Sequence, residues 1–141
     1  MPDDELAADV WQVMAALVID NRDGWKRAVV ERTGMPFSRV RILMRLARHP
    51  MTVKQIAHAA TIDAPAATVA VNDLEDRGLV VRRVDPDNRR CKTVSLTDAG
   101  HEMVGEIRAV GDPAPEPLAS LPTDELRSLQ AILAKVAAHQ P

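Results

Sequence analysis

The segment MTVKQIAHAATIDAPAATVAVNDLEDRGLVVRRVDPDNRRCKTVSLTDAG, residues 51–100, carries the clearest structural signals in this chain of 141 residues. Its first part predicts a helix over residues 53–60, with Ile56 and Ala59 facing inward. The next three residues, Thr61-Ile62-Asp63, have the length and composition of a tight turn between two packed helices. A second helix is therefore expected to begin directly after this turn.

The second helix has recognisable signals at both ends. Asp63 can accept hydrogen bonds from the free amides of the first turn, and Pro65 lacks a donor where none is needed. Gly78 ends the helix, because glycine readily adopts the left-handed conformation found at helix C-termini. The residues expected to face the core are Val69, Leu74 and the alanines of this helix.

Two short runs of β-branched and aliphatic residues, 79–84 and 93–96, predict strands. Between them, Asp85-Pro86-Asp87-Asn88-Arg89-Arg90 combines turn-forming residues with two adjacent arginines. A hairpin that ends in arginines suits contact with phosphate or the DNA minor groove better than burial in a core. The order helix, turn, helix, strand, charged hairpin, strand predicts a winged helix-turn-helix head in a mainly α chain with a small β-hairpin wing.

The segment LEDRGLVVRRVDPDNRR, followed by VSLTDAG at residues 94–100, resembles the MarR family of bacterial transcription regulators. That family's wing is usually written Asp-Pro-x-Asp-x-Arg, and its next helix opens with Leu-Thr-x-x-Gly. The match covers roughly residues 35–100, and two motifs spaced about a hairpin are more specific than a helix-turn-helix alone. The resemblance implies a homodimer that binds double-stranded DNA at a pseudo-palindromic site, with repression as its expected role.

The wing departs from the family pattern at its tip. Aligned through Asp85-Pro86, the family's second Asp becomes Asn88 and its Arg becomes Arg90, whereas a slip of one residue pairs Asp87 with Arg89. Family members commonly use the Asp to hold the Arg, so Asn88 would hold it by a neutral hydrogen bond unless one of the two aspartates takes that role. Both alignments place two guanidinium groups at the tip.

The candidate DNA contacts fall on three elements. The resemblance places base-reading positions on the second helix, and the wing and the start of the first helix add cations and hydrogen-bond donors. From residue 63 to residue 76 the chain has four acids and no Lys or Arg, so the alternative is that this helix packs the fold without reading DNA strongly. The candidate residues are Thr52, Lys54, Pro65, Ala66, Thr68, Val69, Asn72, Arg83, Asn88, Arg89, Arg90 and Lys92.

The distribution of charge favours a nucleic-acid partner, although the net charge of −2 does not. Residues 36–97 hold 11 Lys and Arg against 6 Asp and Glu, whereas residues 1–35 hold 4 against 7 and residues 98–141 hold 3 against 7. A basic middle between acidic ends is typical of a DNA-binding head on a body that does not contact DNA. No apolar run is long enough to span a membrane, and the N-terminal segment is acidic, whereas a signal peptide begins with basic residues. The protein is therefore expected to be cytoplasmic and to have no membrane partner.

Three regions are expected: an N-terminal dimerisation helix region at 1–34, the DNA-binding head at 35–97, and C-terminal dimerisation helices at 98–141 with a Pro-rich break at 112–117. Residues 20–24 predict either a bend in the first helix or two helices. Apolar residues near both ends recur at intervals of three and four and have no other obvious partner, which predicts a dimer interface. These residues are Leu6, Val10, Leu17, Leu126, Leu129, Leu133 and Val136.

Further helix boundaries can be predicted from capping signals. An amphipathic helix is expected over residues 37–49. The helix after the wing should be capped by Thr97 or Ser95, and the last helix should be capped by Thr123.

In the MarR family a small, often aromatic or lipophilic molecule binds between head and dimer body and changes the spacing of the heads. The resemblance therefore implies a small-molecule effector. The candidate lining residues here are Trp11, Met14, Trp25 and Phe37. Apolar residues at helical spacing are usually core, so ordinary packing is the alternative for all four.

Other functional classes receive little support. The chain shows no Ser-His-Asp set, glycine-rich phosphate loop or paired catalytic carboxylates, so neither an enzyme nor a cofactor is expected. The four histidines and Cys91 have no metal-ligand spacing. Cys91 lies between two cations, which favour the reactive thiolate and leave a redox role open. The main rival is a winged-helix protein-interaction module whose acidic second helix meets a protein partner.

Overall fold

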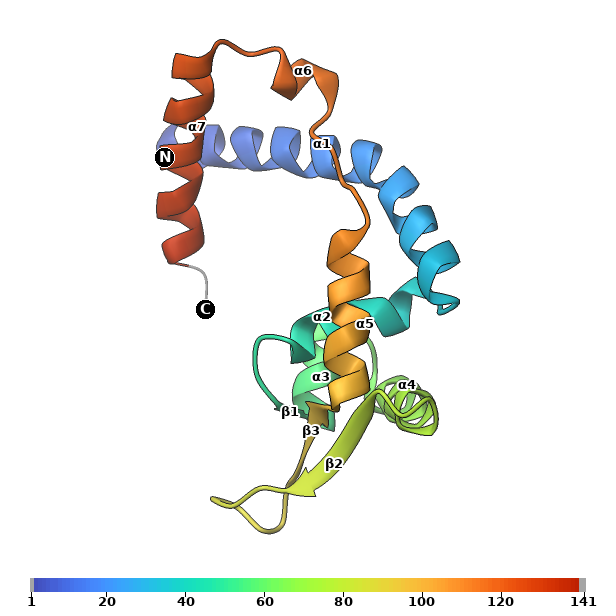
Figure 1. The fold of residues 1–141 in the computed structure, drawn as a ribbon. Helices are drawn as coiled ribbons and strands as arrows, with labels where there is room; N and C mark the ends of the chain where they lie inside the picture. The colour runs from blue at the N-terminus through green and yellow to red at the C-terminus, as the bar shows by residue number, and fades with distance from the viewer. Residues whose placement is uncertain (1, 140–141) are drawn as a thin grey trace. The chain divides into compact units, whose positions relative to one another are not determined.

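The structure, a computed structural model, describes residues 2–139. It is mainly helical, with one small sheet (Figure 1). The helices are α1 (Pro2–Thr33), α2 (Phe37–Leu46), α3 (Val53–Ala60), α4 (Ala64–Asp76), α5 (Asp98–Ala109), α6 (Glu116–Ala119) and α7 (Thr123–Ala138), and the strands are β1 (Met51–Thr52), β2 (Val80–Val84) and β3 (Lys92–Leu96). The chain divides into two compact units, one that ends at Gly111 and one that begins at Asp112.

Helices α3 and α4 form the predicted helix-turn-helix. At the start of α3, Thr52 Oγ1 accepts from the backbone N–H of Gln55 (3.1 Å), and Gln55 Oε1 accepts from that of Thr52 (2.9 Å). Thr61 ends α3 in the left-handed conformation, with φ of 56°. Asp63 Oδ1 accepts from the backbone N–H of Ala66 at 2.7 Å. These bonds satisfy amides that have no partner within either helix, and the predicted cap at Asp63 is confirmed.

Strands β2 and β3 pair antiparallel as the predicted wing, and β1 pairs with the other edge of β3. Sequence patterns do not predict β1, because two residues are too few to show alternation. Directly paired residues share a face of the sheet, and successive residues point to opposite faces. One row therefore holds Met51, Val94 and Arg82, and the row on the opposite face holds Thr52, Thr93 and Arg83.

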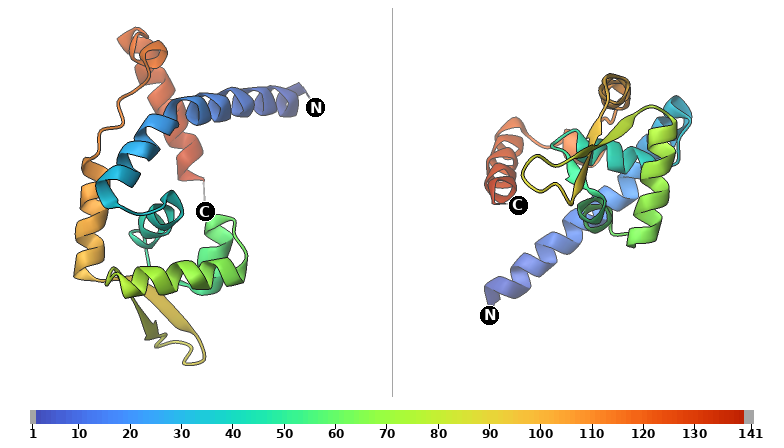
Figure 2. Two further views of the ribbon diagram at one scale, coloured as in Figure 1. Left: turned by 90° about the vertical axis from the view of Figure 1, so that its right-hand side faces the viewer. Right: turned by 90° about the horizontal axis from the view of Figure 1, so that it is seen from below.

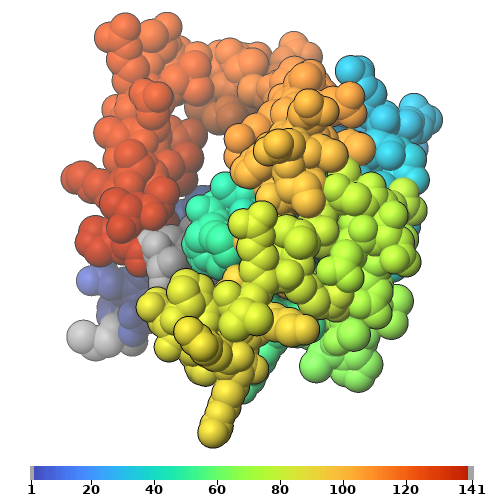
Figure 3. Space-filling view, turned by 60° about the horizontal axis from the view of Figure 1, so that its bottom comes forward, coloured from blue at the N-terminus to red at the C-terminus, as the bar shows by residue number. Residues whose placement is uncertain are grey.

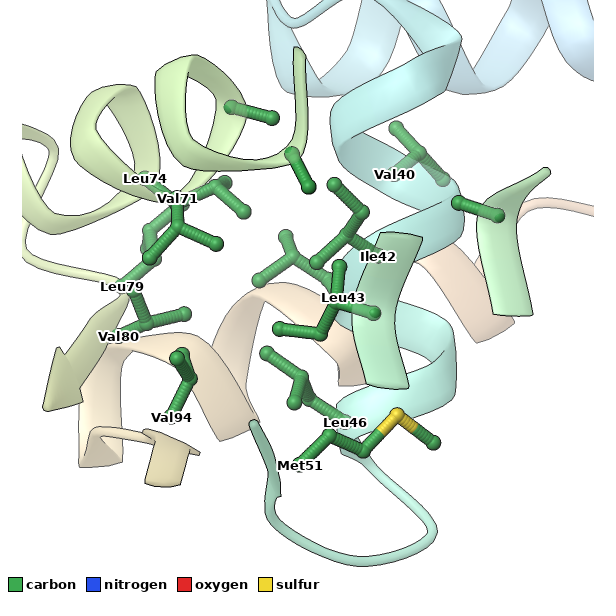
Figure 4. Close-up of a cluster of buried hydrophobic side chains, with 14 of the residues drawn as sticks. Val40, Ile42, Leu43, Leu46, Met51, Val71, Leu74, Leu79, Val80 and Val94 are labelled. Atoms are coloured by element: carbon green, nitrogen blue, oxygen red, sulfur yellow. The ribbon is translucent and has the colours of Figure 1, made fainter. Parts of the chain in front are cut away.

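The core of the first unit lies among α2, α3, α4 and the sheet. Figure 4 shows side chains of α2 meeting those of α4 and the strands, and its labelled residues are Val40, Ile42, Leu43, Leu46, Met51, Val71, Leu74, Leu79, Val80 and Val94. Val29 of α1 and Ile107 of α5 are fully buried in the same cluster. The end of α1 and the helix after the wing therefore pack on the winged head.

The orientation of α4 corrects one prediction. Val69 was expected to face the core, but 60% of its surface is exposed. A step of two residues turns a helix by about 200°, so Val69 lies on the side opposite both Ala67 and Val71. The buried residues of α4 are Ala67, Ala70, Val71 and Leu74.

Helix α2 ends at Leu46, so the expected end at His49 is wrong. The residue before a proline is disfavoured in helical conformation, and His49 precedes Pro50.

The second unit also differs from expectation at two boundaries. Thr123 is the first helical residue of α7, which follows Pro122 and has no side-chain cap, so the predicted Thr123 cap is wrong. Helix α6 already begins at Glu116, inside the break expected at 112–117. Pro117 is compatible with that helix because it occupies the first turn, where its missing N–H costs nothing.

Helix α1 is a single helix of 32 residues with a bent axis, which settles the alternatives at residues 20–24 in favour of a bend (Figures 1 and 2). Near the bend, Asn21 Nδ2 donates to the carbonyl oxygen of Leu17 at 2.7 Å. Such a bond competes with the backbone ladder of the helix. Across residues 2–139, none of the helices combines the length and the hydropathy required to span a membrane.

Hydrogen bonds of Thr97 connect the beginning of α5 to the end of the helix-turn-helix. Thr97 Oγ1 donates to the carbonyl oxygen of Gly78 at 2.6 Å and accepts from the backbone N–H of Gly100 at 3.1 Å, so Thr97 caps α5 and Ser95 does not. A Cβ on Gly100 would overlap the carbonyl oxygen of Leu79. Any other residue would force α5 away, which is the physical reason for glycine here.

We expect Gly100→Ala to lower the free energy of unfolding by about 1–3 kcal/mol or more, because the added methyl group has no room. Gly105→Ala is the matched control in the same helix, since a Cβ there meets nothing within 4 Å. It should raise stability by roughly 0.5–1 kcal/mol through helix propensity. Urea denaturation followed by circular dichroism measures both, and equal stability of the two variants would contradict the close approach at Gly100.

Candidate nucleic-acid interface

The outward face of α4 carries hydrogen-bonding and apolar groups side by side. Thr68 Oγ1 donates to the carbonyl oxygen of Ala64 at 3.0 Å and keeps its lone pairs as acceptors. Val69 and Ala66 expose methyl groups, which suit contact with a thymine methyl. All five candidate positions of this helix are exposed: Pro65, Ala66, Thr68, Val69 and Asn72.

Arg82 of β2 reaches across to α4. Its Nη2 donates to Asn72 Oδ1 at 2.7 Å, and its Nη1 donates to Glu75 Oε1 at 2.8 Å. The direction of this side chain follows from the sheet register, because Arg82 shares a face with the buried residues Val94 and Met51. A guanidinium group from the wing thus lies against a helix that has no Lys or Arg of its own.

Asp73 of α4 binds two arginines from different segments. Arg39 Nε of α2 lies 3.1 Å from one carboxylate oxygen, and Arg77 Nε, just beyond α4, lies 3.2 Å from both. The hydrogen bond from Arg39 is the main reason why the pKa of Asp73 lies below its ordinary value, and Arg77 adds to it against an opposing contribution from desolvation. The pair with Arg39 joins α2 to α4.

The acidic composition of α4 is therefore offset by cations from elsewhere in the fold. Asp63 caps the helix, Asp73 pairs with Arg39 and Arg77, and Glu75 pairs with Arg82. The pair of Asp73 with Arg77 has the i,i+4 spacing that a sequence can show, whereas Arg39 is 34 residues from Asp73 and has no local signal. Two of the acids of α4, Asp73 and Glu75, therefore have cationic partners in the folded head.

The wing tip is a compact loop in which most of the hydrogen bonds are donated by backbone N–H groups. The N–H of Asp85 donates to the carbonyl oxygen of Cys91 (3.0 Å), and Asp85 Oδ1 accepts from the N–H of Asp87 (2.9 Å). Asn88 Oδ1 accepts from the backbone N–H of Arg90 at 3.2 Å, so it holds the main chain and not the guanidinium. Within residues 2–139, the guanidinium groups of Arg89 and Arg90 make no hydrogen bond or ion pair, which leaves them available to an outside anion.

The remaining candidates lie close to the wing. Pairing of β1 with β3 places Thr52 opposite Thr93, next to the exposed Lys92, and Arg83 lies on the same row. Lys54 is exposed in the first turn of α3. Figure 3 shows the projecting wing, in yellow, and α4, in green, on one face of the first unit.

Comparison with known proteins agrees with this geometry. A model described as the MarR family matches residues 33–90, which run from the end of α1 to the wing tip. Over these residues the chain resembles the MarR family. Members of that family are transcription regulators, and the winged helix-turn-helix of this chain has the fold of their heads.

Solved structures of MarR-family proteins share the fold over nearly the whole chain. Wild-type apo MarR from E. coli is 22% identical, with a TM-score of 0.71, over 89% of this chain and 95% of that one. A point mutant of MepR from S. aureus, bound to an oligodeoxyribonucleotide, is 21% identical, with a TM-score of 0.61, over 91% and 96%. CouR from Rhodococcus jostii RHA1, bound to p-coumaroyl-CoA, is 21% identical, with a TM-score of 0.63, over 100% and 97%.

The structure brings together two of the four residues considered for an effector site. The rings of Trp25 and Phe37 meet edge to face, 5.6 Å apart between centroids, and Lys26 and Arg41 lie over Phe37 at 5.2 and 5.6 Å. Trp11 is 66% exposed and lies 14 residues before Trp25, about 21 Å along a straight helix. Met14 is half-buried on the same first half of α1.

The residues considered for a dimer interface remain largely uncovered within their own units. On α1, Leu6, Val10 and Leu17 are exposed. On α7, Leu126 and Leu129 are half-buried, whereas Leu133 and Val136 are exposed.

Other chemistry has little support at this surface. Cys91 is a half-buried free thiol, whose sulfur lies 3.4 Å from Asn88 Nδ2. Among residues 2–139, no group of three His, Cys, Asp or Glu side chains is arranged to hold a metal ion.

We expect Asp73→Asn to destabilise the winged head at pH 7, because Arg39 and Arg77 lose their charged partner. A carboxylate whose pKa is lowered in the folded protein adds stability above its ordinary pKa and loses it as pH falls through the lowered value. The difference between wild type and variant should therefore shrink from pH 5 to below the ordinary aspartate pKa of about 3.9. Urea midpoints at several pH values test this, and Asp76→Asn removes one charge nearby as the control. A difference that stays constant down to pH 2 would contradict the assignment.

Proposed function

We propose that this protein is a sequence-specific DNA-binding repressor of the MarR family that binds a pseudo-palindromic operator as a homodimer. One observation carries the proposal: α4 and the wing lie on one face of the head (Figure 3), and the wing tip carries Arg89 and Arg90, whose guanidinium groups have no partner within residues 2–139. Winged DNA-binding heads insert an exposed helix into the major groove of DNA. A cationic hairpin beside that helix contacts the DNA backbone or the minor groove. The oligodeoxyribonucleotide bound to MepR supports this use of the fold.

The two elements have different tasks in this proposal. Thr68, Val69 and Asn72 read base edges by hydrogen bonding and by apolar contact with thymine methyl groups. Arg89 and Arg90 supply the largest part of the electrostatic attraction, because α4 has no cation of its own. Thr52, Lys54, Arg83 and Lys92 extend the phosphate-binding surface around the wing.

The homodimer follows from apolar surface that the chain leaves uncovered. Leu6, Val10 and Leu17 on α1 and Leu133 and Val136 on α7 expose more than a third of their surface. A second copy of the chain can bury these residues by a two-fold interface, which also places two heads for two half-sites about 34–36 Å apart. Repression then follows from occupancy of the operator, in the cytoplasm where the DNA is.

A small aromatic effector is the third part of the proposal. The p-coumaroyl-CoA bound to CouR supports an aromatic ligand in this fold, and Trp25 and Phe37 form the aromatic pair of this chain. The cations Lys26 and Arg41 beside Phe37 favour a ligand that also carries a carboxylate. Such a ligand acts by binding one spacing of the heads more tightly than another.

The rival function is a protein-interaction module without DNA affinity. The paired acids of α4 weaken this alternative, because Asp73 and Glu75 already have cationic partners within the head. Salt dependence separates the two functions, since DNA binding weakens with a log-log slope of about −0.9 for each phosphate neutralised.

We expect Arg90→Ala to weaken binding to specific and random DNA together and to reduce the salt slope by about 0.9. The reason is that the Arg90 guanidinium contributes charge without base specificity. Arg108→Ala on α5 removes an exposed cation outside the wing and should leave the slope unchanged. Fluorescence anisotropy at several salt concentrations measures both. Unaltered binding by Arg90→Ala on both duplexes would favour the protein-interaction module.

We expect the protein to be a dimer at micromolar concentration and Val136→Asp to weaken dimerisation by at least about tenfold, because it places two charges in a two-fold apolar interface. Ala131→Asp, on the opposite side of α7, is the matched control and should remain dimeric. Sedimentation velocity distinguishes the species. A folded wild-type monomer at micromolar concentration would refute the interface.

We expect aromatic carboxylates such as salicylate to change the fluorescence of Trp25 saturably and to weaken DNA binding in parallel. The variant Trp11→Phe removes the other tryptophan and leaves Trp25 as the reporter. Phe37→Leu should weaken the ligand response, because it removes the ring that Lys26 and Arg41 face. No saturable change at millimolar ligand would count against an aromatic site here.

A further inference from the structure

The contact between Arg82 and Asn72 joins the wing strand to the base-reading face. Arg82 spans two residues of α4, with Nη2 on Asn72 Oδ1 at 2.7 Å and Nη1 on Glu75 Oε1 at 2.8 Å. The Arg82 side chain is only 22% exposed, whereas its partners Glu75 and Asn72 are exposed. Because Nη1 and Nη2 of Arg82 bind two different residues, the plane of the guanidinium group is fixed. The position of the Asn72 amide is therefore fixed as well.

The chemistry of this contact determines which end of the amide faces Arg82. A guanidinium group has five N–H donors and no acceptor, so the Asn72 atom in contact must be the oxygen. The amide nitrogen of Asn72, with its two hydrogens, is then the end left for an outside partner. Asn72 itself is exposed on the outward face of α4.

We infer that Arg82 is a positioning residue that makes Asn72 a hydrogen-bond donor toward DNA and thereby determines base preference at one position of each half-site. An asparagine with a free amide typically pairs with adenine, using its oxygen and nitrogen together. An asparagine held through its oxygen presents donors, which match the adjacent O6 and N7 acceptors of guanine. The inference rests on the proposed DNA-binding function.

The neighbouring arginine has a different role because of the strand geometry. Arg83 is the next residue of β2, pairs with Thr93, and points to the opposite face of the sheet from Arg82. Within residues 2–139, Arg83 makes no ion pair or side-chain hydrogen bond. Arg83 therefore serves as a matched control, in the same strand and with the same charge, that cannot orient Asn72.

The test begins with selection of binding sites by the full-length wild-type protein from a random duplex library. Asn72→Ala identifies the position that depends on Asn72, and wild type should prefer guanine there by roughly 5- to 150-fold over adenine. Arg82→Lys keeps the charge but replaces the two guanidinium nitrogens that contact Asn72 and Glu75 separately with a single nitrogen. It should reduce this preference to less than about threefold, while Arg83→Lys should change overall affinity without changing the preferred base.

A double-mutant cycle shows whether Arg82 acts through Asn72. In the Asn72→Ala background, Arg82→Lys should cause no further change in base preference at this position. If Arg82→Lys does not fold, Asn72→Asp supplies the test, because it keeps the contact with Arg82 and removes the donor. Asn72→Asp should then shift the preference to cytosine, whose N4 amino group is a donor.

Three results would overturn the inference: an unchanged preference in Arg82→Lys, an equal loss in Arg83→Lys, or retained guanine preference in Asn72→Asp. Each of these leaves sequence-specific binding by the wild type intact and so leaves the proposed function standing. Selection of no sequence at all by the wild-type protein would instead refute the DNA-binding function and the inference with it.

Discussion

The register of the three-stranded sheet determines on which face of the sheet Arg82 and Arg83 lie. β3 lies between β1 and β2, and its pairing with both puts Arg82 on the row of the buried residues Met51 and Val94, while Arg83 lies on the opposite row. A slip of one residue would exchange the faces of these two arginines. The Arg82 bridge to α4 would then be lost. Burial of Val94 and Met51 therefore determines which cation meets α4.

Contacts with other segments also explain how α4, which is acidic, can belong to a DNA-binding head. Asp73 and Glu75 lie on α4, yet their partners come from α2, from the end of α4 and from β2. Each pair is at least partly exposed and contributes little stability alone. Together these pairs hold the orientation of α4 against α2 and the wing, and they reduce the repulsion that the composition of α4 suggests. Within residues 2–139, Arg89 and Arg90 at the wing tip are two adjacent cations whose guanidinium groups have no ion pair.

The resemblance to the MarR family concerns the winged head, whereas the uncovered apolar residues lie on the first half of α1 and on α7. The head is complete within a single unit, because its core includes Val29 of α1 and Ile107 of α5. The first half of α1 and the whole of α7 have no comparable core within their own units. The head therefore has its core within one unit, whereas the proposed dimer interface consists of residues that contribute little to that core.

Local signals in the sequence determined the winged helix-turn-helix, including the cap at Asp63, the strands of the wing and the arginines at its tip. These features depend on residues within a few positions of one another, so a single sequence is sufficient to predict them. The outward direction of Val69, the strand β1, the choice of Thr97 as a cap and the contacts of Arg82, Asp73 and Trp25 were decided only by the tertiary structure. Asp73 and Arg39 are 34 residues apart, and Asn72 and Arg82 are 10 apart, so their contacts depend on sheet register and helix packing. No local pattern encodes register or packing, because both result from burial of the whole core at once.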